Sequence, residues 1–296
     1  MKLPQPQIIS KKDLGYPSLL REIPAAPENL YILGVLPPES SLKIAIVGTR
    51  KATSEGRILA KQIANDLAKN GLIIVSGLAM GIDAAAHEGA LAAQGRTIAV
   101  LANGLDTIYP RQNEKLAQEI LEKNGAIISE YPPGTPAYPN QFLERNRIVS
   151  GLCVATIIIE APIHSGALVT ARHALDQGRE VFVMPGSPRQ SNYQGSHLLI
   201  RNGARLVADA EEILEDLASI LPNYDLNIPE KTDKLKNITD ESEKLILETF
   251  QNKESLTVDK LCEITKLEPY IVNQRLTFLM LKGLLEEKNG KFELKK

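Results

Sequence analysis

Apolar positions between residues 42 and 220 follow two alternating patterns. Short runs that are apolar or β-branched at successive positions predict buried strands, and between them apolar residues recur three or four positions apart, as in helices. The predicted strands are 44–47, 72–75, 97–101, 126–129, 154–159, 181–183 and 205–207. The predicted helices lie near 54–69, 82–93, 113–123, 141–150, 166–176, 195–202 and 209–219. This alternation predicts an α/β fold, an extended Rossmann-like parallel sheet with helices on both faces and ligands at the carboxyl ends of the strands.

The two ends of the chain have different patterns. Residues 1–41 are rich in proline, which favours extended and turn conformations, so we expect an N-terminal arm packed on a Rossmann-like domain of residues 42–220. Residues 221–238 contain two prolines among polar and charged residues and are typical of a linker. Residues 239–296 show three helical stretches and then a hairpin pattern around Asn289 and Gly290, which predicts a small winged-helix domain.

Composition narrows the range of functions. The 296 residues are 43% hydrophobic and 24% charged, without an apolar run long enough to cross a bilayer, so we expect a cytoplasmic protein without a membrane partner. The two cysteines, Cys153 and Cys262, indicate neither a disulfide framework nor a metal site. A net charge of −2 argues against general attraction of polyanions, so any nucleic-acid binding requires a local cationic pocket.

Glycine next to serine, threonine or asparagine follows four of the first five predicted strands of this domain. Such turns let a ligand approach the backbone and leave N–H groups free for phosphate oxygens. Because these turns share one rim of a parallel sheet, we expect them to form one site. The candidates after the first three strands are Arg50, Lys51, Ser76, Gly77, Asn103, Gly104 and Arg111. After the fifth strand, Ser165, Gly166 and Thr170 open a helix whose N-terminus predicts an anion site.

The segment 139–151 adds a second group of candidates. Phe142, Arg145 and Asn146 stand at i, i+3 and i+4, so a ring, a guanidinium and an amide share one helix face, while Arg147 points further round. No lysine occurs between residues 123 and 231, so apart from histidine the basic residues of this stretch are all arginines. Arginine can bind a phosphate through two N–H groups and can stack on bases. The alternative is that both arginines are surface residues paired with Glu144 or Glu160 and that Phe142 belongs to the core.

Six motifs in one order resemble DNA processing protein A, the DprA/Smf family. They are residues 46–50 (IVGTR), 76–87 (SGLAMGIDAAAH), 103–110 (NGLDTIYP), 129–136 (SEYPPGTP), 145–151 (RNRIVSG) and 165–172 (SGALVTAR). The resemblance covers about residues 15–220, and a winged-helix tail also occurs in many members. It implies a non-enzymatic protein without a cofactor that binds single-stranded DNA, protects it and loads the RecA recombinase during natural transformation.

The resemblance also implies roles for particular residues. DNA contacts fall on Arg50, Arg111, Phe142, Asn146 and Arg147. A homodimer surface overlapping the RecA contacts falls on the segment 195–201 with His197, Ile200 and Arg201, and on Leu206. Many members carry a further helical domain of SAM or helix-hairpin-helix type before the segment that corresponds to Tyr16-Pro17. Only about fifteen residues precede that segment here, so we expect this chain to lack the domain.

Two enzyme classes compete with this hypothesis. The lysine-decarboxylase-like nucleotide phosphoribohydrolases share the fold variant, but Arg172 and His173 stand where their catalytic glutamate is required, which leaves Glu160 or Glu130 as substitutes. A nicotinamide-dependent oxidoreductase is a weaker alternative, because residues 48–53 lack the second and third glycines of the dinucleotide fingerprint. The four histidines show no metal-ligand spacing, so no metal is expected.

Overall fold

The computed structural model describes residues 4–221, 241–250, 255–281, 284–288 and 290–294. The chain divides into two compact units, Met1–Ile228 and Pro229–Lys296. Apart from Leu221, the linker predicted at residues 221–238 lies outside the described residues.

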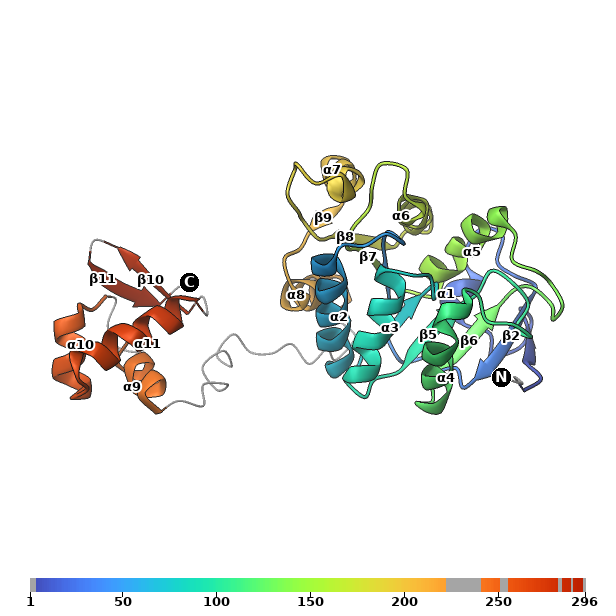
Figure 1. Cartoon of the computed structure of the whole chain (residues 1–296). Coiled ribbons are helices and arrows are strands. Elements are labelled where there is room, and N and C mark those ends of the chain that lie inside the picture. Colours follow the sequence, from blue (N-terminus) through green and yellow to red (C-terminus); the bar gives the residue numbers. More distant parts are fainter. Residues whose placement is uncertain (1–3, 222–240, 251–254, 282–283, 289, 295–296) are drawn as a thin grey trace. The chain divides into compact units, whose positions relative to one another are not determined.

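The first unit is built around one mixed sheet (Figure 1). Its described part has nine strands in the order β1-β2-β6-β5-β4-β3-β7-β8-β9. The strands are β1 Gln7–Ser10, β2 Asn29–Gly34, β3 Lys43–Val47, β4 Ile73–Ser76, β5 Thr97–Val100, β6 Ala126–Ser129, β7 Ala155–Ile158, β8 Glu180–Val183 and β9 Arg205–Leu206. Strands β3 to β9 pair in parallel, which confirms the predicted sheet.

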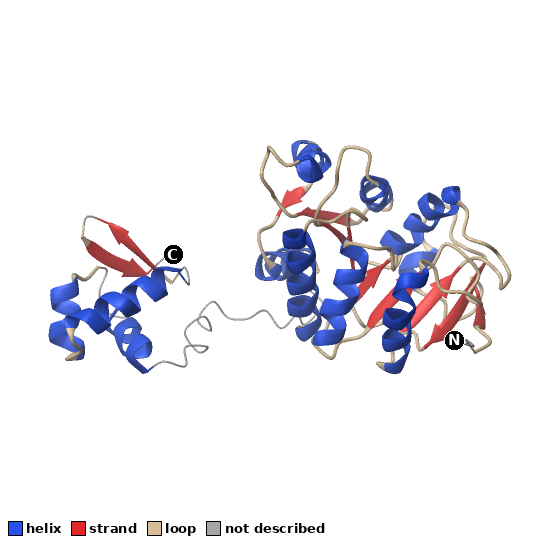
Figure 2. Ribbon diagram, viewed as in Figure 1, coloured by secondary structure: helices blue, strands red, loops and turns tan. Residues whose placement is uncertain are grey.

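Helices cover both faces of this sheet (Figure 2). Side chains at alternate positions of β3 point to opposite faces, so Ala45 and Val47 belong to one core and Ile44 and Ile46 to the other. The helices and 3-10 turns of this unit are α1 Ser18–Arg21, α2 Ser54–Lys69, α3 Ile82–Ala92, η1 Arg111–Asn113, α4 Glu114–Glu122, α5 Pro139–Gly151, α6 Gly166–Asp176, η2 Ser191–Tyr193, α7 Gln194–Arg201 and α8 Ala210–Ile220. Side chains of α1, α5, α6 and α7 contribute to the first core, and those of α2, α3, α4 and α8 pack on the opposite face.

The N-terminal segment corrects one prediction. The sequence predicted no strand before residue 44, yet β2 pairs antiparallel with β6, and β1 pairs antiparallel with β2. Leu30 and Ile32 of β2 are buried in the sheet core, so the segment extends the sheet instead of lying on the domain as a separate arm. The surrounding prolines concealed this short strand, which covers the edge that β6 would otherwise expose.

The second unit contains the elements predicted for it. Helices α9 Glu241–Phe250, α10 Val258–Thr265 and α11 Pro269–Leu281 are followed by β10 Leu285–Lys288, which pairs antiparallel with β11 Lys291–Leu294. Buried apolar side chains from the helices and both strands form its core, among them Ile246, Leu261, Leu276, Leu285 and Phe292. Asn289 of the predicted hairpin turn lies outside the described residues.

Two absences concern only the described part of the chain. None of its helices has the length and apolar character needed to cross a bilayer. Cys153 and Cys262 are free thiols, and no group of three or more histidine, cysteine, aspartate or glutamate residues comes together there as a metal site would require.

His87 of α3 is a buried polar side chain with an unusual environment. Thr97 donates its hydroxyl hydrogen to the carbonyl of Ile74 at 2.6 Å, so the 2.7 Å contact between its oxygen and His87 Nδ1 places the imidazole hydrogen on Nδ1. The other ring nitrogen, Nε2, is buried without a partner among the described atoms. Burial, assisted by the charge of Arg145, lowers the pKa of His87 to about 3, so the ring is neutral in the folded protein.

This burial predicts a pH dependence of stability. Below its ordinary pKa of about 6.5 the unfolded chain protonates His87 while the folded chain does not, so stability falls as the pH drops from 6.5 toward 3. Glutamine does not titrate, so the free energy of unfolding of His87→Gln should fall less steeply with decreasing pH than that of the parent. Between pH 6 and 4.5 the difference in slope should be up to about 1.4 kcal/mol per pH unit. Urea unfolding of both proteins across this range tests the prediction, and parallel curves would contradict it.

Candidate nucleic-acid interface

A cavity of about 550 Å³ lies at the carboxyl ends of the central strands, between the loops that follow β3, β4 and β5 and the helices α5 and α6. This is the rim on which the sequence places the ligand site. Nine of the predicted site residues line it: Arg50, Lys51, Gly77, Phe142, Arg145, Asn146, Ser165, Gly166 and Thr170.

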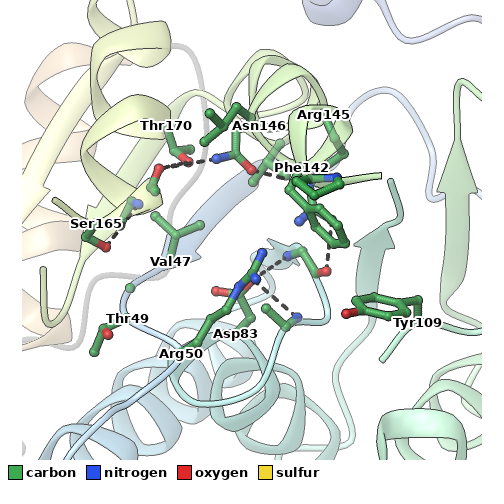
Figure 3. A pocket seen from close by; sticks show the side chains of 18 of the residues that line it. Val47, Thr49, Arg50, Asp83, Tyr109, Phe142, Arg145, Asn146, Ser165 and Thr170 are labelled. Atoms are coloured by element: carbon green, nitrogen blue, oxygen red, sulfur yellow. Dashed lines mark hydrogen bonds between the residues drawn. The ribbon is translucent and has the colours of Figure 1, made fainter. Parts of the chain in front are cut away.

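A cation and two aromatic rings face one another in this cavity (Figure 3). The guanidinium carbon of Arg50 lies 4.8 Å from the centre of the Phe142 ring, and the ring of Tyr109 lies 5.4 Å from that of Phe142 at an angle of 55°. Arg50 is exposed and forms no ion pair with any described residue. The arrangement offers a charge for phosphate and aromatic faces for bases.

Tyr109 was not predicted as a site residue. It follows β5 and precedes Pro110 in a cis peptide, and 46% of its surface is exposed although the ring is large and apolar. The sequence did contain a signal, because Tyr109 is an aromatic residue in a loop at the rim where ligands bind. The prediction selected only glycine, asparagine and arginine after that strand.

Arg145 lines the cavity but is committed to the protein. The side chain is only 3% exposed, and Nη1 donates to the carbonyl of Gly77 at 2.8 Å and to the carbonyl of Val100. Asp83, nearby, accepts from the backbone N–H groups of Gly77 at 3.1 Å and Ala79 at 3.4 Å. Arg145 therefore holds the loop after β4 in place, and a Cβ at Gly77 would lie 2.6 Å from its guanidinium.

The two buried charges of this cluster depend on each other. Burial raises the pKa of the Asp83 carboxyl, while the charge of Arg145 and the two backbone N–H groups act in the opposite direction. Burial likewise lowers the pKa of Arg145 to about 10, against the influence of Asp83, which leaves the guanidinium charged at neutral pH. Each group thus supplies a countercharge that opposes the effect of burial on the other.

The N-terminus of α6 forms the opposite wall of the cavity. Ser165 caps the helix by accepting a hydrogen bond from the N–H of Ala167 at 3.2 Å, and Gly166 is exposed at the first helical position. Asn146 of α5 donates from Nδ2 to the carbonyl of Gly166 at 3.2 Å, which joins the two helices. Thr170 is buried and donates back to the same carbonyl at 3.4 Å. Helix N-termini of this kind favour anionic groups.

Three predicted residues at or just after the ends of β4 and β5 do not line the cavity. Ser76 is fully buried and donates its hydroxyl to the carbonyl of Ile46 at 2.6 Å, so it joins neighbouring strands. Asn103 is buried and donates from Nδ2 to the carbonyls of Gly104 and Thr107, each at 2.9 Å. Gly104 is needed for packing, because a Cβ there would lie 2.4 Å from the carbonyl oxygen of Pro132. These residues shape the loops and do not face a ligand.

Two predicted arginines also lie outside the cavity wall. Arg147 forms a bidentate pair with Glu130, with distances of 2.7 and 2.6 Å, and donates from Nε to the carbonyl of Ala25 at 3.1 Å. Arg147 is thus paired with a carboxylate, as the alternative in the sequence analysis expected, but the carboxylate is that of Glu130. Arg111 is 91% exposed and lies 3.6 Å from Glu114 one turn along. It remains available to an extended strand, whereas Arg147 ties α5 to the N-terminal segment.

The predicted assembly surface on α7 and β9 is arranged differently from our expectation. The family resemblance placed Ile200 on this surface. Instead Leu198 is 45% exposed, while Leu199 and Ile200 pack on the sheet core. Arg201 and Leu206 are exposed, and His197 is held by the carbonyl of Gly186, 3.0 Å from Nε2. The exposed apolar residues here are therefore Leu198 and Leu206.

The fold and cavity define a class, a Rossmann-like binding protein whose central pocket presents a stacked arginine and aromatic rings. The model of the DNA recombination-mediator protein A family matches residues 7–218. The chain is 43% identical over 217 residues to Protein Smf of Escherichia coli, covering 73% of this chain and 58% of that protein. It is 41% identical over 201 residues to the DNA processing protein DprA of Streptococcus pneumoniae, covering 68% and 71%. The chain belongs to the DNA recombination-mediator protein A family.

Solved structures agree with this assignment. The X-ray structure of Streptococcus pneumoniae DprA has a TM-score of 0.68 and 39% identity, covering 73% of this chain and 75% of that one. DNA processing protein A of Helicobacter pylori, whose structure concerns a single-stranded DNA binding mode, has a TM-score of 0.63 and 33% identity, covering 74% and 97%. The chain spans 55% of the Synechocystis Protein Smf and 58% of the Escherichia coli one.

Proposed function

We propose that this protein binds single-stranded DNA in the cavity at the carboxyl ends of the strands, protects it, and delivers it to a recombinase of the RecA type during natural transformation. The protein acts in the cytoplasm, without catalysis and without a cofactor. Arg50 carries the proposal: an exposed guanidinium without an ion-pair partner in the described structure, stacked on Phe142 beside Tyr109. A single strand offers phosphates and unstacked bases together, whereas a duplex hides its base faces.

The state of the carboxylates disfavours the phosphoribohydrolase alternative. Glu130 is paired with Arg147, and Glu160 is fully buried with its oxygens bound by Thr53 and Asn192. The carboxylate in the described cavity wall is Asp83, which accepts backbone hydrogen bonds beside Arg145. A catalytic acid or base must reach the substrate, and these carboxylates are committed to the fold.

Direct binding measurements test the proposal. Fluorescence polarisation with a labelled single-stranded oligonucleotide of mixed sequence should show tight binding that weakens with salt, and the matched duplex should bind more weakly. A nucleoside-monophosphate hydrolysis assay runs in parallel. Equal affinity for both DNA forms, or hydrolysis without DNA binding, would refute the proposal.

The second unit is proposed to be a winged-helix module. Its third helix, α11, carries Asn273, Gln274 and Arg275, and Tyr270 is 71% exposed on the same helix. Residues 239–296 contain ten lysines and arginines against eleven aspartates and glutamates, so strong sequence-independent binding to duplex DNA is not expected. A protein contact, or a weak DNA contact, fits this balance better.

We also propose that two copies associate through α7 and β9, so that one strand engages two cavities and gains avidity. Exposed Leu198 and Leu206 supply the apolar contact. We propose that the same surface contacts the recombinase, so that a second copy and the recombinase compete for it.

The association predicts the behaviour of a double variant. Leu198→Glu with Leu206→Arg should give a folded monomer by light scattering, because both side chains are exposed and their loss costs the core little. Its affinity for a long oligonucleotide should fall about tenfold or more, and that for a short one should change little. Leu14→Glu with Ile58→Arg, a matched pair at other exposed positions, should leave both affinities unchanged. An unaltered dimer in the first variant would defeat the proposal.

A further inference from the structure

Glu160, just beyond the end of β7, is a fully buried carboxylate outside the cavity wall. It accepts hydrogen bonds from the backbone N–H of Thr53 at 3.0 Å, from the Thr53 hydroxyl, and from Nδ2 of Asn192 at 2.9 Å. Among the described residues no cation forms an ion pair with it. Neutral donors in fixed directions therefore hold this charge, and a buried carboxylate held in that way fixes the backbone around it.

The groups bound to Glu160 are the two ends of the loop that carries the exposed cations. At one end, the N–H of Thr49 donates to the backbone carbonyl of Glu160 at 2.8 Å. At the other end, Thr53 caps α2 by accepting from the N–H of Gly56 at 2.9 Å. The first turn of α2 is packed directly against the carboxylate, since a Cβ at Gly56 would lie 2.4 Å from it. Arg50 and Lys51 lie between these two anchors.

Asn192 supplies the third anchor, in the middle of the loop. Its Nδ2 donates to the carbonyl of Lys51 at 3.2 Å as well as to Glu160. Asn192 belongs to η2, and the adjoining Tyr193 is buried, its phenol pKa raised by burial and then by the Glu160 carboxylate. One amide therefore connects the backbone of Lys51 with a segment more than a hundred residues later in the chain.

We propose that Asn192 and Glu160 are positioning residues for nucleic-acid binding. They hold residues 48–53 in the conformation in which Arg50 and Lys51 meet the phosphates of a single strand, although neither touches the ligand. Without the Asn192 amide the loop samples other conformations, and binding must first restore the competent one. The apparent affinity is then the affinity of the competent conformation multiplied by the fraction of time that the loop spends in it. The inference rests on the proposed function for its DNA readout.

A double-mutant cycle tests this role. Asn192→Ala should weaken binding of a labelled single-stranded oligonucleotide about fivefold in the otherwise unchanged protein, as expected when the loop loses the hydrogen bond from Asn192 to the Lys51 carbonyl. In a protein that already carries Arg50→Ala and Lys51→Ala it should have almost no effect, because the groups it positions are gone. General loss of stability would weaken binding equally in both backgrounds. Equal effects in both, or none in either, would overturn the inference.

Amide hydrogen exchange provides a readout without DNA. Asn192→Ala should speed exchange at residues 49–53 while leaving the core strands protected. Asn202→Ala is the matched control, because Asn202 is an exposed asparagine at the other end of α7 whose side chain has no hydrogen bond to the described residues. Glu160→Gln, which keeps the side-chain shape, should act like Asn192→Ala. If the parent binds no DNA, the proposed function fails, and the exchange data still decide whether the loop is positioned as inferred; unchanged exchange would refute it.

Discussion

Arg50→Ala is expected to weaken binding of single-stranded DNA about tenfold at moderate salt, because it removes a charge–phosphate contact and the cation stacked on Phe142. The slope of log affinity against log salt should become shallower by about 0.7, the value for one phosphate contact on a single strand. The melting temperature should change little, since Arg50 is exposed and forms no ion pair in the described structure. Polarisation titrations at several salt concentrations measure both quantities.

Arg96→Ala is the matched control for this prediction. Arg96 is also exposed, but it directly precedes β5 and therefore lies at the opposite rim of the sheet. Both substitutions change the net charge by the same amount, so general electrostatic attraction is weakened equally. If the two variants lost affinity and salt dependence to the same extent, Arg50 would be an ordinary surface charge and the cavity would not be the binding site.

Arg145→Met should have the largest effect on stability, a loss of about 3–5 kcal/mol in the free energy of unfolding at pH 8. The substitution leaves the Asp83 carboxyl group buried without its main countercharge and removes the donor to the carbonyls of Gly77 and Val100. Because burial already raises the pKa of Asp83 and Arg145 opposes that rise, the variant should have a still higher Asp83 pKa. Protonation would then relieve the unpaired charge, so the loss should shrink as the pH is lowered.

A second substitution separates charge from packing in this cluster. Asp83→Asn combined with Arg145→Met removes the unpaired charge while an amide oxygen can still accept the N–H of Gly77. The double variant should be more stable at pH 8 than Arg145→Met alone, and its stability should depend less on pH. If the two losses simply add, the coupling between these residues is absent and the assignment is wrong.

Periodicity was sufficient to predict the central sheet because its strands are buried on both faces. Every residue of β3 is buried, and all of them after Lys43 are apolar. Such an unbroken apolar run is typical of a strand covered on both faces. Strand β2 lacked this advantage: it lies between proline-rich stretches and pairs antiparallel with β6. Its place depends on a partner nearly a hundred residues away, which local patterns do not contain.

The helix face predicted for α5 shows where sequence reasoning on the site succeeded and where it failed. The spacing of Phe142, Arg145 and Asn146 placed them on one face, and all three line the cavity. Spacing also placed Arg147 further round, where it meets Glu130, whereas the family resemblance had assigned it to DNA. What spacing does not contain is whether a guanidinium is free: Arg145 is bound by carbonyls of the loop after β4 and the end of β5, distant in sequence.

The edge formed by β9 determines how a second copy can attach there. The strand has only two residues, and Arg205 lies 3.3 Å both from Glu180 of the neighbouring strand and from Asp216 of α8. A short edge crossed by charges is a poor template for another strand, so the sheet is not expected to continue from one subunit into the next. An interface at Leu198 and Leu206 would then rely on side-chain burial without a backbone ladder. A competing protein could then replace one subunit without unzipping any strand.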